Sequence, residues 1–105
     1  MTWFLPWAAG YAEDNHIRFH AGNVFSSDVF YEDQPGEKGI WAKMGVLVQE
    51  METMSLYCTA ARAGKQALGI LTAGSSIHSD TALTNEQREK NLDSMIRCAL
   101  ELAGI

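Results

Sequence analysis

The chain has 105 residues, a length that fits one small domain with a modest hydrophobic core. Its composition is that of a globular protein, with 47% hydrophobic and 20% charged residues and no repetitive tract. A net charge of -5 without basic clusters argues against a nucleic-acid or anionic-membrane surface and leaves cations or neutral polar molecules as partners.

The N-terminal segment, residues 1–10 (MTWFLPWAAG), is apolar, but it lacks the basic region of a signal peptide and is too short to span a bilayer. We interpret residues 1–7 as an apolar N-terminal stub of a single partial domain covering residues 1–105. Trp3 and Trp7 are expected to cover a hydrophobic surface. We expect no membrane partner and a cytoplasmic location, because no other segment resembles a transmembrane helix.

Helical and extended patterns alternate along the first part of the chain. Residues 7–13 fit a helix that ends near Asn15, a residue type that tolerates the left-handed conformation. Alternating apolar residues predict a strand over residues 17–24. Residues 25–28 indicate a loop, and a polar turn follows at residues 33–36.

The middle of the chain continues the alternation with more apolar strands. Residues 40–44 fit a short helix, and the apolar run at residues 46–48 predicts a strand covered on both faces. Residues 51–63 carry apolar side chains at helical spacing, with Gly64 as a stop signal. Residues 67–73 (ALGILTA) predict another covered strand.

The last helix has the clearest start signal. Thr84 and Gln87 fit a capping box, in which each side chain satisfies the backbone N–H of the other residue. The apolar face predicted for this helix consists of Leu92, Met95, Ile96, Ala99, Leu100 and Ala103. The order of elements is that of an α/β layer protein.

Cysteine and histidine give no metal-binding signal. Cys58 and Cys98 lie in apolar helical patterns and are interpreted as buried free thiols of a reducing compartment. His16, His20 and His78 lack the spacing of metal ligands, so no metal is expected.

Polar residues follow three of the predicted strands, at residues 25–28, 50–52 and 74–76. Ligands of open α/β sheets sit beyond the carboxyl ends of strands, so these segments are expected to converge on one pocket. Glu50 and Glu52 suit a neutral polyhydroxy ligand such as a ribose, because one carboxylate accepts hydrogen bonds from two adjacent hydroxyls. Without further information, the same two residues also fit solvated charges at a strand end.

Three segments closely resemble the bacterial-type, hexameric purine nucleoside phosphorylases: GNVFSSDVFY (residues 22–31), WAKMGVL (residues 41–47) and EMET (residues 50–53). The resemblance runs from about residue 8 to the end of the chain and corresponds to the C-terminal half of the family's chain. It implies an α/β, three-layer fold, here with about three strands and flanking helices.

The resemblance also implies an activity. Family members are glycosyltransferases that cleave purine (deoxy)nucleosides with phosphate, giving the free base and (deoxy)ribose 1-phosphate. The expected ligands are therefore a purine nucleoside and inorganic phosphate as co-substrate, with no cofactor.

The family's site residues can be carried over to matching positions. Glu52 matches the glutamate that holds the ribose hydroxyls, Glu50 its companion near the 2′-hydroxyl, and Met51 the methionine packed on the sugar. Phe30 matches the aromatic residue near the purine, although it also fits a plain core position. Ser27 matches a residue that lines the base pocket.

Catalytic positions show a departure from the family. Arg88 matches an arginine that approaches the active site, but Ser75 stands where the family has the aspartate that protonates purine N7. A serine hydroxyl cannot replace a carboxyl as a general acid, which typically contributes about 10²–10⁴-fold to the rate. Asp80 lies five positions farther along the sequence and is an alternative acid that would have to swing in.

The family's chains are also much longer, and their N-terminal half supplies the phosphate-binding glycine loop and arginines. Neither is recognisable here, so stand-alone activity is doubtful, and we expect a homo-oligomer or association with a complementary chain. Three functions remain open: the nucleoside half of a phosphorylase site, a catalytically weak or inactive nucleoside-binding or assembly module, and a nucleosidase-type hydrolase.

Overall fold

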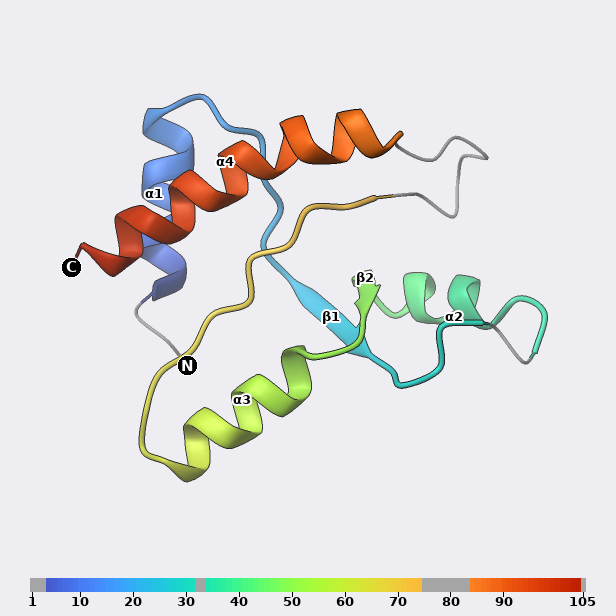
Figure 1. Ribbon diagram of the computed structural model, residues 1–105. Helices are drawn as coiled ribbons and strands as arrows, with labels where there is room; N and C mark the ends of the chain where they lie inside the picture. Colours follow the sequence, from blue (N-terminus) through green and yellow to red (C-terminus); the bar gives the residue numbers. More distant parts are fainter. Residues whose placement is uncertain (1–3, 32–33, 75–83, 105) are drawn as a thin grey trace. The chain divides into compact units, whose positions relative to one another are not determined.

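The computed structural model describes residues 4–31, 34–74 and 84–104. These residues form a mixed α/β structure, as expected for the fold class, with the elements α1 (Phe4–Asp14), β1 (Asn23–Ser26), α2 (Glu37–Lys43), β2 (Val46–Glu50), α3 (Thr53–Arg62) and α4 (Asn85–Ala103) (Figure 1). Two compact units are present. The sheet unit consists of Ala21–Lys65, and the helical unit consists of Met1–His20 with Gln66–Ile105.

A parallel pair of strands forms the centre of the sheet unit, with α2 packed against β2 and α3 against β1. The register pairs Asn23 with Val46 but Val24 with Val48, so Leu47 is an extra residue in β2. From there the strands stay in step, and Ser26 lies opposite Glu50. The carboxyl ends of both strands therefore meet at one edge, as the sequence predicted for these two segments.

Gly22 makes room for the extra residue of β2. A Cβ atom at this position would lie 2.7 Å from Cδ1 of Leu47, which is closer than van der Waals contact allows. On the side of α2, the rings of Phe25 and Trp41 stack with centroids 4.3 Å apart and planes 20° from parallel. The stacked aromatic pair thus links β1 to α2.

The end of α3 confirms the predicted stop signal. Gly64 has a φ of 67°, in the left-handed region that favours glycine. Its N–H donates to the Ala61 carbonyl at 3.1 Å, and the N–H of Lys65 donates to the Ala60 carbonyl at 2.8 Å. These two bonds form a Schellman motif, which satisfies the last carbonyl groups of the helix.

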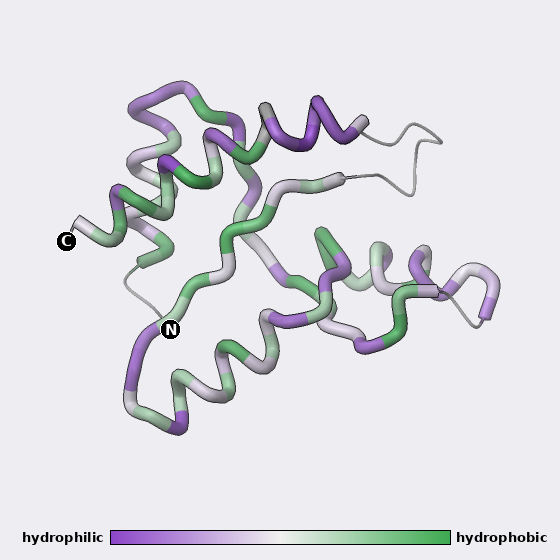
Figure 2. Tube along the Cα trace, viewed as in Figure 1, coloured by the Kyte–Doolittle hydropathy of each residue, from purple (hydrophilic) through white to green (hydrophobic). Residues whose placement is uncertain are grey.

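In the helical unit, α1 packs against α4 and buries Ala12 and Cys98. The predicted capping box starts α4: the N–H of Thr84 donates to Gln87 Oε1 at 3.0 Å, and the N–H of Gln87 donates to Thr84 Oγ1 at 3.1 Å. Figure 2 shows hydrophilic residues along the first turns of α4 and apolar ones farther on.

Two predicted strands differ from the structure. The strand predicted at residues 17–24 occupies only Asn23–Ser26 and extends into the segment predicted as a loop. The segment 67–73, the third strand of the expected fold, is not a strand in the structure. Both errors have one physical cause, because alternating or continuous apolar residues become a strand only where a partner backbone completes the hydrogen-bond ladder.

The end of α1 shows a smaller difference. The left-handed residue is His16, with a φ of 56°, rather than Asn15. The N–H of His16 donates to the Glu13 carbonyl at 3.2 Å, and the N–H of Ile17 donates to the Ala12 carbonyl at 2.8 Å. The helix therefore ends in the same motif as α3, one residue later than predicted.

Several surfaces expected to be covered are exposed. Leu47 of β2 is 51% exposed, so this strand is not covered on both faces. On α4, Cys98 is buried, whereas Ile96 and Leu100 of the predicted apolar face are 49% and 66% exposed. Cys58 is exposed rather than buried. Among the described residues, no helix combines the length and apolarity needed to cross a bilayer.

Candidate functional site

The carboxylate of Glu50 lies at the carboxyl end of β2 and accepts hydrogen bonds from a side chain of β1 and from the backbone at the start of α3. Its Oε1 accepts from the hydroxyl of Ser26, the residue opposite it in β1. Its Oε2 accepts from the backbone N–H groups of Glu52 at 2.7 Å and Thr53 at 2.6 Å. The half-buried carboxylate therefore joins both strands to the start of α3.

These contacts set the charge of Glu50. Partial burial acts to raise its pKa, but the hydrogen bonds from Ser26, from the Thr53 and Glu52 backbone, and from the Thr53 side chain outweigh it. The pKa falls from 4.5 to about 2, so Glu50 is ionised throughout the neutral range.

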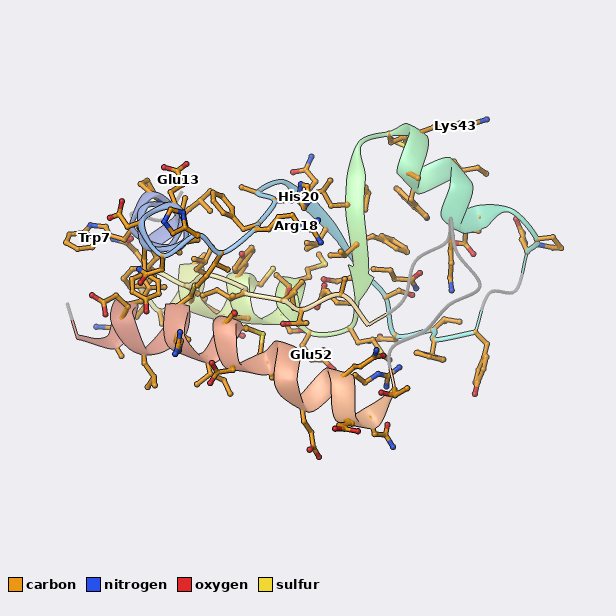
Figure 3. All side chains as sticks on the ribbon, turned by 90° about the horizontal axis from the view of Figure 1, so that it is seen from above. Trp7, Glu13, Arg18, His20, Lys43 and Glu52 are labelled. Carbon is orange, nitrogen blue, oxygen red and sulfur yellow. The ribbon has the colours of Figure 1, made fainter. Side chains whose placement is uncertain are left out.

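Glu52, by contrast, is exposed and occupies the N-cap position of α3 without capping the helix through its side chain. Within the described part of the chain its carboxylate has no hydrogen-bond or ion-pair partner. Figure 3 labels it where the chain passes from β2 to α3. Met51, between the two glutamates, is 39% exposed. The turn thus presents a carboxylate and a soft apolar side chain to its surroundings.

The residues predicted for the base pocket lie after β1. Phe30 is 67% exposed and meets Tyr31 edge to face, with ring centroids 5.0 Å apart. Ser27 is half-buried, and its Oγ accepts from the N–H of Val29 at 3.1 Å in a tight turn. Phe30 is therefore not a core residue in the sheet unit, and its ring is accessible.

A small cavity of about 90 Å³ lies beside this turn. Its lining consists of Phe25, Ser27, Val29, Tyr31, Glu37, Lys38, Trp41 and Gln49. Ligand pockets usually measure about 300–1,000 Å³, so this cavity is too small for a nucleoside. Of the predicted binding residues it includes only Ser27.

A wider hollow of about 360 Å³ lies in the helical unit. It is lined by Pro6, Trp7, Gly10, Tyr11, Asp14, Cys98, Glu101 and Leu102. None of these residues belongs to the predicted site. The larger hollow therefore does not coincide with the site that the sequence predicts.

Of the predicted catalytic residues, Arg88 lies in α4 of the helical unit. A Cβ atom at Gly74 would lie 3.8 Å from both Nε and Nη2 of Arg88, so the guanidinium lies beside the residue that precedes Ser75. Ser75 itself, the alternative acid Asp80 and His78 lie outside the described residues.

Sequence reasoning missed one residue of this arrangement, Ser26. The sequence assigned a role to Ser27, whereas Ser26 makes the contact with Glu50. Only the strand register distinguishes these two adjacent serines, and the register depends on the extra residue Leu47.

Comparison with known proteins places this arrangement in a family. A family model described as the phosphorylase superfamily matches residues 8–105. The chain belongs to the phosphorylase superfamily. Two similar relatives are the DeoD-type purine nucleoside phosphorylases of Thermoanaerobacter sp. (strain X514), 45% identical over 87 residues, and of Myxococcus xanthus, 42% identical over 92 residues. These alignments cover 83% and 88% of this chain but only 37% and 38% of the relatives.

The predicted resemblance to bacterial-type purine nucleoside phosphorylases is thus confirmed for this phosphorylase-superfamily chain. The chain spans less than two fifths of the length of these relatives. In the described part of this chain, the Glu50–Glu52 turn places two carboxylates at the end of β2, and backbone hydrogen bonds hold that of Glu50.

The low pKa of Glu50 predicts a pH-dependent stability. Because the pKa is lowered on folding, the stabilisation is complete above the ordinary value of 4.5 and is lost as the pH falls through about 2. Urea unfolding followed by helical circular dichroism should show the free energy of unfolding dropping further across this window in the wild type than in Glu50→Gln. Parallel curves for the two proteins would contradict the assignment.

Proposed function

We propose that this chain contributes the ribose and base half of a site for phosphorolysis of purine nucleosides. The observation that carries the proposal is the exposed carboxylate of Glu52, which has no partner among the described residues, beside a Glu50 carboxylate bound by the protein itself. Membership of the phosphorylase superfamily and the activity for which the relatives are named support it.

The proposed roles follow from the chemistry of each side chain. Glu52 accepts hydrogen bonds from the two adjacent ribose hydroxyls, and such charge-assisted bonds are roughly twice as strong as neutral ones. Met51 lies against the sugar as an apolar surface, with Glu50 beside it. The exposed ring of Phe30 stacks near the purine, and Ser27 borders the base.

In the proposed reaction a phosphate oxygen forms a bond to C1′ of the ribose while the bond from C1′ to the purine nitrogen breaks. The electron pair leaves with the base, which takes up a proton at N7. Arg88 is the cation we assign to the site. Inorganic phosphate is the co-substrate, no cofactor takes part, and we assign no phosphate-binding residue to this chain.

Two other functions are weighed against this one, because Ser75 stands where the general acid is expected. A nucleoside-binding or assembly module with little or no turnover needs no acid at that position. A nucleosidase-type hydrolase uses water in place of phosphate. Phosphate dependence separates the hydrolase from the phosphorylase, and turnover separates both from the binding module.

We also propose that the chain works in an assembly, either with further copies or with a complementary polypeptide. Large apolar side chains are exposed in both units, among them Leu47 at 51%, Met54 at 65% and Leu100 at 66%. Exposed apolar side chains mark interaction sites in soluble proteins where they gather in one large patch.

The first prediction concerns sugar binding. Glu52→Gln should weaken the binding of inosine about ten- to hundredfold, because it removes charge-assisted hydrogen bonds worth about 1.5–3 kcal/mol. Isothermal titration calorimetry measures the change, with Glu101→Gln on α4 as the matched control. Equal losses in both variants would refute the assignment of Glu52.

The second prediction concerns the general acid. Ser75→Asp should raise the rate of purine release from inosine in the presence of phosphate, because it restores a carboxyl at the expected position. The rate is followed by ultraviolet absorbance with and without phosphate. An unchanged rate would place the acid elsewhere, and a gain without phosphate would favour the hydrolase.

The third prediction concerns assembly. Sedimentation velocity of the purified chain should show species larger than an 11.6 kDa monomer, because association covers the exposed apolar side chains. A single monomeric species across the concentration range would argue against self-association and leave only a complementary chain.

A further inference from the structure

The start of α3 is capped by residues other than its N-cap. A helix leaves its first N–H groups without partners, and the N-cap side chain usually accepts a hydrogen bond from one of them. Here the N-cap residue is Glu52, and its side chain makes no such bond. The N–H of Thr53 donates instead to Glu50 Oε2 at 2.6 Å, and the N–H of Met54 donates to Ser26 Oγ at 3.0 Å.

Ser26 and Glu50 act together in this cap. The Ser26 hydroxyl donates its proton to Glu50 Oε1 and accepts from Met54 N–H, so both of its hydrogen-bonding functions are used. Glu50 uses its second oxygen for two backbone N–H groups, including that of Glu52. The backbone N–H groups of Glu52, Thr53 and Met54, between β2 and the first turn of α3, are therefore all hydrogen-bonded to Glu50 or Ser26.

We propose that Ser26 and Glu50 are positioning residues that cap α3 in place of Glu52, so that the Glu52 carboxylate is held outward for a ribose hydroxyl pair. This inference rests on the proposed function for its ligand and on the hydrogen bonds above for its mechanism. It assigns Glu50 an indirect effect through Glu52, rather than a direct contact with the 2′-hydroxyl.

Charge and geometry agree with this division of roles. A carboxylate has about four acceptor positions, and three of those of Glu50 are taken by Ser26, Glu52 and Thr53. The same contacts lower the pKa of Glu50 to about 2, as expected for an anion at a helix N-terminus. The Glu52 carboxylate has no partner within the described residues and keeps its acceptor positions for a ligand.

A double-mutant cycle with inosine tests the proposal. Ser26→Ala should weaken inosine binding about five- to tenfold in the wild-type background but less than about twofold in the Glu52→Gln background, because Ser26 acts through Glu52. Ser26→Thr, which keeps the hydroxyl, should restore binding. Ser55→Ala, a change in the same first turn of α3, is the control. Equal losses in both backgrounds would overturn the proposal.

The 2′-deoxy analogue separates an indirect from a direct role of Glu50. If Glu50 positions Glu52, Glu50→Gln weakens binding of inosine and of 2′-deoxyinosine by similar factors, because the 3′-hydroxyl still contacts Glu52. A loss confined to inosine would mean that Glu50 touches the 2′-hydroxyl, and the positioning role would be wrong.

Amide hydrogen exchange tests the cap without any ligand. Exchange at Thr53 and Met54 should accelerate in Ser26→Ala and stay unchanged in Ser55→Ala. Unchanged exchange in both variants would overturn the cap, whatever the binding data. A different result is expected if the proposed function is wrong. Glu52→Gln would then leave inosine binding unchanged, while amide exchange at Thr53 and Met54 would still accelerate in Ser26→Ala.

Discussion

The hydrogen bonds to the Glu50 carboxylate are the constraint on which the rest of the sheet unit depends. They connect β1 through Ser26, β2 through Glu50 itself, and α3 through the N–H groups of Glu52 and Thr53. Charge-assisted bonds of this type are stronger than neutral ones, and two of them satisfy backbone N–H groups at the start of α3 that would otherwise be unpaired. Three elements therefore share one anionic centre, and the direction in which α3 leaves the sheet follows from it.

That centre exists only because the two strands are shifted in register. Without the extra residue Leu47, the pairing of Asn23 with Val46 would continue to Ser27 opposite Glu50, and Ser26 would face Gln49. Gly22 lies against the side chain of this extra residue, because a Cβ atom there would lie 2.7 Å from Cδ1 of Leu47.

The parts of the fold that could be predicted from sequence are those set by local chemistry. The capping box of Thr84 and Gln87 and the stop at Gly64 involve residues a few positions apart, and both are present. The two glutamates at the end of a strand were likewise identified from the abrupt change from apolar to acidic residues.

Features that depend on distant partners could not be read in this way. The extended segment 17–22 carries a strand pattern but has no strand in the structure, whereas Asn23–Ser26 is a strand because β2 lies beside it. The contribution of Ser26 was hidden for the same reason, because two adjacent serines are equivalent until the register is known. Resemblance to a family pointed to the Glu50–Glu52 turn but did not indicate that Ser26 contacts the Glu50 carboxylate.

The exposed apolar side chains support the proposal that further polypeptide covers this chain. Each helix and β2 expose at least one large apolar side chain, namely Trp7, Ile40, Leu47, Met54 and Leu100. Parallel sheets in α/β proteins are covered on both faces, and two strands alone bury too little to be stable. The chain also spans only 37% of the Thermoanaerobacter relative.

A nucleoside needs a pocket several times larger than the cavity of about 90 Å³ found in the sheet unit. In the proposed function the Glu52 carboxylate accepts hydrogen bonds from the sugar, whereas the cavity in the sheet unit is too small to enclose a nucleoside. Covering the exposed apolar side chains and enclosing the ligand are therefore one physical requirement, which a neighbouring polypeptide against the sheet unit would meet in a single step.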